Sequence, residues 1–166
     1  SITHLKLYYT RNTYTITYVL PEAGVQGVTS STTTAQGQGS TNEYKYGANV
    51  TITATMRLGY TLNSMTANGV AVNNPYTYEI EEDTEIEITT TAGQYNYTVE
   101  FEFETLTAGT YVKNTNLKAD ATLTGAVDSE VVYTDISSVV TEVSGFSYAS
   151  FTEGRVIQAY ETDTSE

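Results

Sequence analysis

Residues 97–105 read YTVEFEFET, and this stretch decides the fold class. Apolar and aromatic residues alternate with polar ones at every step along it. Alternation of period two places one set of side chains on the dry face of a β-strand and the other set in water. The dry set is Tyr97, Val99, Phe101 and Phe103, and the wet set is Thr98, Glu100, Glu102 and Glu104. The stretch therefore predicts a strand in a half-buried sheet.

The same alternation recurs along most of the chain. It is found in residues 13–20 (TYTITYVL), 49–56 (NVTITATM) and 76–90 (YTYEIEEDTEIEITT), with turn-forming residues between these runs. The dipeptide Asn68-Gly69 between alternating flanks predicts a tight hairpin, because both residues accept the positive φ of a type I′ turn. Thr and the 15 Tyr suit pleated, half-buried surfaces. We expect an all-β to α+β protein of mostly antiparallel sheets.

Two segments depart from the alternation. Residues 29–43 (TSSTTTAQGQGSTNE) carry almost no apolar side chain and predict a long solvated loop. Residues 135–143 (DISSVVTEV) place Ile136, Val139, Val140 and Val143 at helical spacing, with Asp135 as an N-cap and Gly145 beyond the end. Their β-branched content opposes a helix, so helix and non-helix remain open here.

The composition narrows the range of partners. Twenty Asp and Glu against seven Lys and Arg give the 166 residues a formal charge of −13 and a pI near 4.2. Such a surface repels phosphate backbones and anionic lipid, so nucleic acid is not an expected partner. No apolar run approaches the roughly 18 residues that cross a bilayer, so membrane insertion is not expected either. With no Cys, disulfides and thiolate metal sites are excluded.

An internal repeat divides the chain. TYTITYVL from Thr13 matches NYTVEFEF from Asn96, an offset of 83 residues. Residues 46–54 and 59–69 of the first half are matched with residues 125–136 and 145–155 of the second. We expect two small β-rich repeat domains at residues 12–94 and 95–166, with residues 1–11 as the closing strand of a preceding or neighbouring repeat.

We expect the first eleven residues to form a strand that belongs to a different sheet from the strand that follows. Their pattern, with Leu5, Leu7, Tyr8 and Tyr9, repeats the shape of TEIEITTTAGQYNYTV, which closes the first domain and opens the second. Two outcomes are open. The strand completes the second domain of its own chain, or it completes that of a neighbouring copy and joins subunits into a filament.

Residues 44–89, YKYGANVTITATMRLGYTLNSMTANGVAVNNPYTYEIEEDTEIEIT, resemble the internalin-type B-repeat family of bacteria. The second half, with YTVEFEFET, LTGAVDSEVVYT and GFSYAS, resembles the MucBP family of mucin-binding repeats. Met65 stands near the place where the first family usually has a Trp. The resemblance implies β-grasp-like domains, each with at most one short helix, in long extracellular proteins of the bacterial cell surface or cell wall.

These observations favour a non-enzymatic stalk or fibre segment of a bacterial adhesin, whose partners are neighbouring copies of the same repeat. Binding of mucin or other glycans is implied by the resemblance alone. The alternatives are a filament subunit joined by its N-terminal strand and a carbohydrate-binding module, whose site would begin at exposed tyrosines. We expect no cofactor. His4 is the single histidine, which excludes a multi-histidine metal site within one chain, and no GxSxG, P-loop or dinucleotide motif is present.

Two weaker candidate sites remain. The turn EEDT and its flank place Glu81, Glu82, Asp83 and Glu85 together, and such oxygen ligands suit calcium, but the spacing of an EF-hand loop is missing. Lys6, Lys45, Lys113 and Lys118 are candidates in principle for isopeptide cross-links. Both features have an ordinary interpretation as solvated surface, which we prefer.

Overall fold

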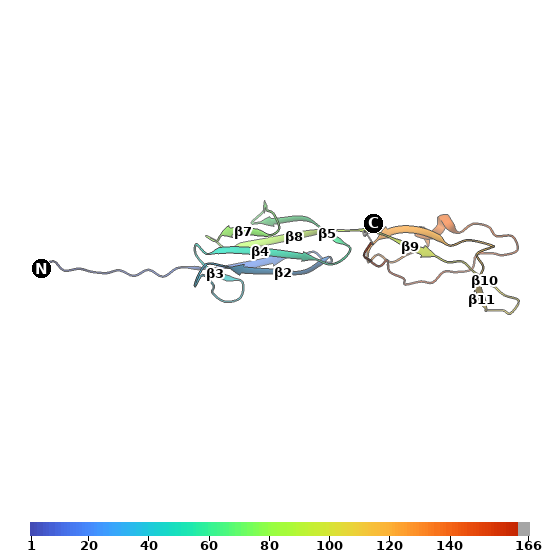
Figure 1. Ribbon diagram of the computed structural model, residues 1–166, viewed down its shortest axis with the longest axis horizontal. Coiled ribbons are helices and arrows are strands. Elements are labelled where there is room, and N and C mark those ends of the chain that lie inside the picture. The colour runs from blue at the N-terminus through green and yellow to red at the C-terminus, as the bar shows by residue number, and fades with distance from the viewer. Residues whose placement is uncertain (163–166) are drawn as a thin grey trace. The chain divides into compact units, whose positions relative to one another are not determined.

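The computed structural model describes residues 1–162. The chain folds into two compact units. Unit one is Ser1–Thr91 and unit two is Ala92–Glu166. The regular secondary structure of both is mainly short, mostly antiparallel strands, and the described residues hold one short α-helix (Figure 1). The prediction of mostly β domains with at most one short helix is confirmed.

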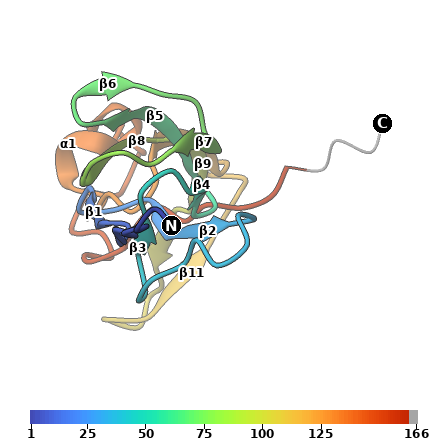
Figure 2. The ribbon, with the colours of Figure 1, turned by 90° about the vertical axis from the view of Figure 1, so that its left-hand side faces the viewer.

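Unit one contains two sheets. The first has five strands in the order β3-β1-β8-β5-β6, namely Glu43–Lys45, Thr13–Val19, Thr84–Ala92, Tyr60–Ala67 and Val70–Ala71. The second has three strands in the order β2-β4-β7, namely Val25–Thr32, Asn49–Met56 and Tyr76–Glu79. In Figure 2, β6 lies at the outer end of the larger sheet.

The first and last strands of unit one lie side by side and run in the same direction. β1 pairs with β8 in parallel, from Ile16 opposite Thr84 to Val19 opposite Glu87. The other edge of β1 pairs with β3 in the antiparallel sense. β1 and β8 therefore form the centre of the larger sheet, with β3 outside β1 and the β5–β6 hairpin outside β8.

A single apolar core lies between the two sheets. Val50, Ile52 and Ala54 alternate along β4, while Ile86 and Ile88 alternate along β8, and all five side chains are buried. The intervening Thr and Glu side chains face outward because successive residues of a strand point to opposite faces. The remaining core residues are Ile16, Tyr44, Ala48, Met65, Ala67 and Ile80.

Side-chain hydroxyl groups link the two sheets across this core. The buried Tyr44 of β3 donates a hydrogen bond to Ser30 Oγ of β2, at 2.7 Å. Tyr78 of β7 donates to Thr84 Oγ1 of β8, at 2.8 Å. Asn42 accepts from Ser30 Oγ at 2.9 Å, which gives that hydroxyl a second partner. The polar atoms that this core buries are thus satisfied, as buried polar groups must be.

The predicted Asn68-Gly69 hairpin is confirmed. Thr66 and Ala67 of β5 pair with Ala71 and Val70 of β6, and the two residues between them form the turn. Asn68 has φ 47° and Gly69 has φ 82°, both in the left-handed region that a type I′ turn requires.

The prediction of a solvated loop over residues 29–43 is partly wrong. Residues 29–32 belong to β2, where Ser30 and Thr32 pair with Ile52 and Val50 of β4. Thr and Ser are good strand residues where one face stays wet, so a lack of apolar residues did not prevent pairing. The remaining loop is held by Gln38, whose side-chain amide donates to Ser40 O and Glu43 O.

Unit two has fewer paired strands. β9 (Gln94–Val99) pairs with β12 (Ala121–Ala126), and β10 (Glu102–Glu104) pairs with β11 (Tyr111–Lys113), all in the antiparallel sense. Alternation along residues 97–103 is as predicted, but Tyr97, Val99, Phe101 and Phe103 are only half-buried. The buried apolar residues of the described part of unit two are Val127, Ile136 and Ile157.

The helix expected over residues 135–143 is displaced and shorter. The α-helix α1 is Tyr133–Ile136, and a turn of 3-10 helix, Ser137–Val139, follows it. Asp135 is not the N-cap; it lies inside the helix, and its carboxylate accepts the backbone N–H of Val132 at 2.8 Å. The β-branched residues that follow do not continue the helix, in line with their lower helix propensity.

The matched segments of the two halves agree at their start and differ afterwards. Residues 13–20 hold β1, and their counterparts 96–103 run through β9 into β10. Residues 49–54 are in β4, whereas their matched segment, 125–136, is the end of β12, a turn and α1. The pattern of Gly and alternating residues that linked these segments did not specify the same elements.

Candidate functional site

The N-terminal segment is exposed and unpaired. Residues 1–12 belong to no strand, and the blue trace of Figure 1 has no arrow there. The residues expected to join repeats are fully available to solvent: the exposed fractions are 86% for Leu5, 71% for Leu7, 85% for Tyr8 and 90% for Tyr9. In the described part of the chain this segment does not complete unit two, so the outcome within one chain is not observed.

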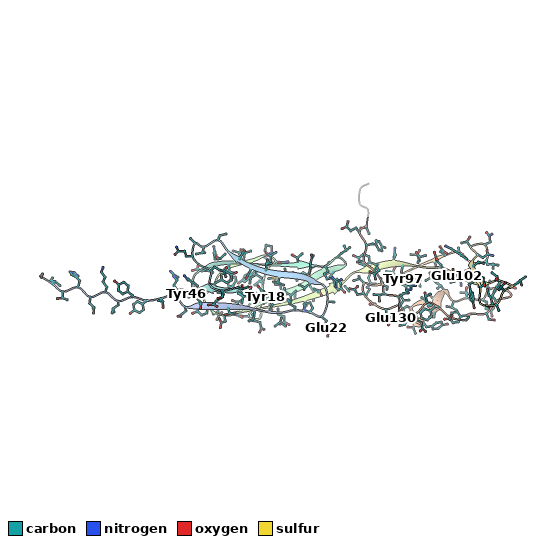
Figure 3. The ribbon with its side chains drawn as sticks, turned by 90° about the horizontal axis from the view of Figure 1, so that it is seen from below. Tyr18, Glu22, Tyr46, Tyr97, Glu102 and Glu130 are labelled. Atoms are coloured by element: carbon teal, nitrogen blue, oxygen red, sulfur yellow. The ribbon has the colours of Figure 1, made fainter. Side chains whose placement is uncertain are left out.

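The end of this segment is anchored to unit one. Arg11 Nη1 donates to Tyr46 O at 2.6 Å, and Tyr46 N donates to Asn12 O at 2.8 Å. The rings of Tyr14 and Tyr46 meet edge to face with centroids 6.4 Å apart, and Tyr46 is labelled in Figure 3. The chain is therefore fixed from Arg11 onward, and the exposed apolar residues lie before this anchor.

The acidic turn between β7 and β8 is used for backbone contacts. Asp83 Oδ1 accepts the N–H of Thr15 at 2.9 Å, and Glu82 Oε1 lies 3.4 Å from the amide nitrogen of Asn68. Glu81 and Glu85 are exposed. Among residues 1–162, no group of three or more His, Cys, Asp or Glu side chains is arranged to hold a metal ion. A shallow depression borders the turn, lined by Thr15, Thr17, Asn68, Asp83, Thr84 and Glu85.

The tyrosines expected to pack in sheets are half-buried. Tyr76 and Tyr78, two residues apart on one face of β7, stack with ring centroids 4.6 Å apart. Burial raises the pKa of Tyr78 and of Tyr18, while a hydrogen bond to a neighbouring hydroxyl opposes the rise in each case. Burial also raises the pKa of Tyr97, with Asp135 as a second cause. These rings serve packing.

Two lysines of unit two have specific partners. Lys113 Nζ lies 2.8 Å from Asp120 and 3.3 Å from Glu100, and these carboxylates raise its pKa. Lys118 Nζ donates to Val139 O and to Thr141 Oγ1, and stands 4.2 Å from the centroid of the Phe101 ring. Lys113, at the end of β11, thus links Asp120, just before β12, with Glu100, between β9 and β10.

Unit two has an open strand edge that the sequence analysis missed. The N–H groups along a strand point alternately to its two edges. The N–H of Thr105 faces β11, since it donates to Thr110 O at 2.7 Å, whereas the N–H of Asn96 turns away from β12 and donates to the Tyr160 hydroxyl at 3.2 Å. Odd-numbered residues therefore face β11 and β12. By the same alternation the N–H groups of Thr98 in β9 and Glu102 in β10 face the opposite edge, where the described residues place no strand, and Glu100 lies between these two strands.

The corresponding edge of unit one is occupied. The N–H of Ile16 faces the β3 side and donates to Asn42 O, and the N–H of Thr15 faces the β8 side and donates to Asp83 Oδ1. Thr15, Thr17 and Val19 thus present their N–H groups toward β8. Under the 83-residue offset their counterparts are Thr98, Glu100 and Glu102. Once the β1–β8 pairing of unit one is known, the 83-residue offset transfers the direction of each N–H and points to the open edge.

No family model, curated protein or solved structure matches the chain. Within residues 1–162, no helix has the length and apolar character needed to cross a membrane.

Proposed function

We propose that the chain is a non-enzymatic stalk or fibre segment, whose role is to bear tension while it holds other parts of a protein apart. The observation that carries this proposal is the parallel pairing of the first and last strands of unit one, β1 and β8. The setting that we propose with it is the surface of a bacterium. That part rests on the resemblance to bacterial surface repeats.

Parallel terminal strands resist extension. The chain enters unit one at the start of β1 and leaves it at the end of β8, so tension pulls these two strands in opposite directions along their length. The hydrogen bonds between them lie across that direction and are loaded together. If the terminal strands were antiparallel, the same tension would break the bonds one at a time from one end.

The path of tension from unit one to unit two is short. β8 ends at Ala92 and β9 begins at Gln94, with Gly93 as the one residue between them. Little chain is available there to extend before the strands themselves are loaded. The acidic outer residues of β8, Glu85 and Glu87, are exposed and keep that surface hydrated.

Single-molecule pulling tests the proposal, and the absence of Cys allows handles at chosen positions. In the variant Thr13→Cys/Thr91→Cys, tension shears β1 against β8. In Thr13→Cys/Glu85→Cys, both handles are at the end of the sheet where β1 and β8 begin, and tension peels the strands apart. We expect a clearly higher unfolding force in the first geometry, because forced unfolding reports the barrier and not the equilibrium stability. Equal forces in both geometries would refute the mechanical role.

Glycan binding is the second candidate function, and the exposed pair Tyr8 and Tyr9 is the observation that favours it. Aromatic rings open to solvent are surfaces on which sugar rings stack. Titration of the protein with mucin-type oligosaccharides, followed by tyrosine fluorescence, tests this role. Binding that survives Tyr8→Ala/Tyr9→Ala would place any glycan site elsewhere.

A further inference from the structure

We propose that residues 3–10 of one copy add as a parallel strand to the open edge of unit two in a second copy. The added strand would lie beside residues 98–103, as β8 lies beside β1 in unit one. This inference does not depend on the mechanical role of unit one, because it concerns a different unit and a different contact.

The donated segment has the pattern of the strand that fills this position in unit one. THLKLYYT from Thr3 aligns with TEIEITTT from Thr84, which forms most of β8. Leu5 and Leu7 then correspond to Ile86 and Ile88, which are 0% and 1% exposed in unit one. Two aliphatic side chains that are buried in β8 thus have exposed counterparts in residues 3–10, and burying them would stabilise a complex.

The receiving unit has apolar surface to cover. Its inward-facing strand residues remain half-buried, whereas the corresponding Ile16 of unit one is 2% exposed. The described part of unit two also leaves many large apolar side chains more than 40% exposed: Leu106, Tyr111, Val112, Leu117, Val132, Tyr133, Phe146, Tyr148, Val156 and Tyr160. In unit one, from residue 12 onward, the large apolar side chains that are more than 40% exposed are fewer: Val19, Leu20, Tyr46, Leu58 and Val70. A further strand is what the packing of unit two lacks.

The register of unit one predicts which residues meet. Ile16 lies opposite Thr84, and the pairing continues to Val19 opposite Glu87. Transferred to unit two, this register places Leu5 opposite Phe101, and it places His4 and Lys6 opposite Glu100 and Glu102. Apolar residues face each other on one side of the strand pair, and on the other side Lys6 faces the oppositely charged Glu102, an arrangement that stabilises neighbouring strands.

Long-range electrostatic attraction also favours this pairing. The first acidic residue of the chain is Glu22, and before it stand His4, Lys6 and Arg11, in a protein with a formal charge of −13. Glu100 and Glu102 are exposed, and Glu102 is labelled in Figure 3. A basic segment and an acidic edge attract one another, which speeds association and selects the partner.

The contacts of Tyr160 on this edge lie outside the stretch that the register requires. The Tyr160 hydroxyl accepts the N–H of Asn96, and the Tyr160 ring meets Tyr95 with centroids 5.2 Å apart. Both contacts precede Thr98 along the strand. The proposed pairing begins at Val99 and does not displace them. Because donor and acceptor lie on different units, each copy can both give and receive a strand, and such a contact produces open chains of subunits.

A peptide experiment tests the contact directly. The recipient is the protein without residues 1–10, which keeps Arg11 and Asn12 and their contacts with Tyr46. We expect the synthetic peptide of residues 1–12 to bind it with one-to-one stoichiometry in isothermal titration calorimetry. By NMR, hydrogen exchange should slow at the amides of Glu100 and Glu102, the counterparts of Thr17 and Val19 in unit one. No binding, or protection confined to unit one, would overturn the proposal.

Matched variants locate the register. The peptide with Leu5→Ser/Leu7→Ser should bind at least roughly a hundredfold more weakly, since two buried leucines are lost. Glu102→Lys in the recipient should weaken binding by roughly three- to tenfold, and the peptide with Lys6→Glu should recover most of that loss. Glu130→Lys makes the same charge change away from this edge and should have a smaller effect. Equal effects of Glu102→Lys and Glu130→Lys, without recovery, would refute the register.

Measurements on the intact chain distinguish strand donation to a second copy from strand donation within the same copy. Analytical ultracentrifugation should show association that increases with concentration and is lost in the full-length Leu5→Ser/Leu7→Ser variant. These side chains are exposed, so the substitution leaves the folded units undisturbed. A full-length protein that stays monomeric at high concentration, while the peptide binds the truncated recipient, would show donation within one chain and overturn exchange between copies.

Discussion

Asn68 shows how one residue fixes two turns of unit one. Its side-chain oxygen accepts the N–H of Glu85 at 2.8 Å, and its amide nitrogen donates to Asp83 O at 3.0 Å. The residue therefore forms the β5–β6 turn with its backbone and holds the start of β8 with its side chain. The Asn-Gly pair predicts the first role from sequence, because it depends on local φ preferences alone. The second role depends on where β8 passes, and no local pattern specifies that.

Replacing Asn68 should separate these roles. We expect Asn68→Ala to lower the free energy of unfolding of unit one by about 1–3 kcal/mol, because it removes two hydrogen bonds to the start of β8 and places alanine, which cannot form a compensating side-chain hydrogen bond, at positive φ. Asn68→Gly removes the hydrogen bonds but relieves the backbone, so it should cost less. Urea unfolding followed by circular dichroism measures both. The exposed Asn73→Ala is the matched control, with a change within about 0.5 kcal/mol; an equal loss in that control would contradict the assignment.

At the scale of elements, unit one joins its two sheets through tyrosine hydroxyls as well as through aliphatic packing. Tyr18 of β1 and Tyr78 of β7 come from different sheets, and Tyr18 is labelled in Figure 3. Tyr18 donates to Asn42 Oδ1 at 3.3 Å, while Tyr78 donates to Thr84 Oγ1. The Tyr78 bond crosses between the sheets, whereas Asn42 directly precedes β3 in the same sheet as Tyr18. Both tyrosines are donors in their neutral form, so both hydrogen bonds depend on their protonation.

Alkaline pH should therefore weaken unit one. Burial raises the folded-state pKa of Tyr18 and Tyr78 above the ordinary value of 10.0, so the folded form holds these protons more tightly than the unfolded form. Their contribution is fully present below pH 10 and is lost as pH rises through the folded-state pKa. Chemical unfolding from pH 8 to 11 should show a fall in stability, and Tyr18→Phe/Tyr78→Phe should make the fall shallower. An equally steep fall in stability in the wild type and in the variant would contradict this explanation.

The elements also show which parts of the fold are predictable. Strict alternation, as in β4 and β8, predicts strands because burial of one face dominates. The Ser and Thr of β2 and the short helix α1 are decided by neighbours: β2 by its pairing with β4, and α1 by the burial of Ile136. The parallel pairing of β1 with β8 joins residues that are far apart in sequence, so it does not follow from local pattern. The open edge beside Glu100 depends on which strands are its neighbours, so it does not follow from local pattern either. The exposed, alternating Leu5 and Leu7 were expected to join repeats, which stays a prediction.

On the scale of the whole molecule, the two units differ in how much apolar material they bury. Unit one has eleven buried apolar residues in one cluster, whereas the described part of unit two has Val127, Ile136 and Ile157. Small domains are marginally stable because they bury a smaller fraction of their surface. Unit two is therefore the weaker part of the chain when it stands alone.

Calorimetry should resolve two unfolding transitions, with unit two melting first. Ile52→Ala should shift only the upper transition, at a cost of about 2–5 kcal/mol, and Ile157→Ala should shift only the lower one. The peptide of residues 1–12 should raise the lower transition and leave the upper one in place, since binding to the folded form alone stabilises it. One cooperative transition, moved alike by both substitutions, would show that the units do not unfold separately.

The hydroxyl links between the sheets of unit one have a consequence for biogenesis. Tyr44 with Ser30, and Tyr78 with Thr84, join the two sheets by hydrogen bonds, whereas many small secreted domains are cross-linked by disulfides. Such links form on folding and need no oxidant or thiol exchange. With no Cys in its sequence, this polypeptide can mature in a reducing compartment or an oxidising one and reach the same covalent state.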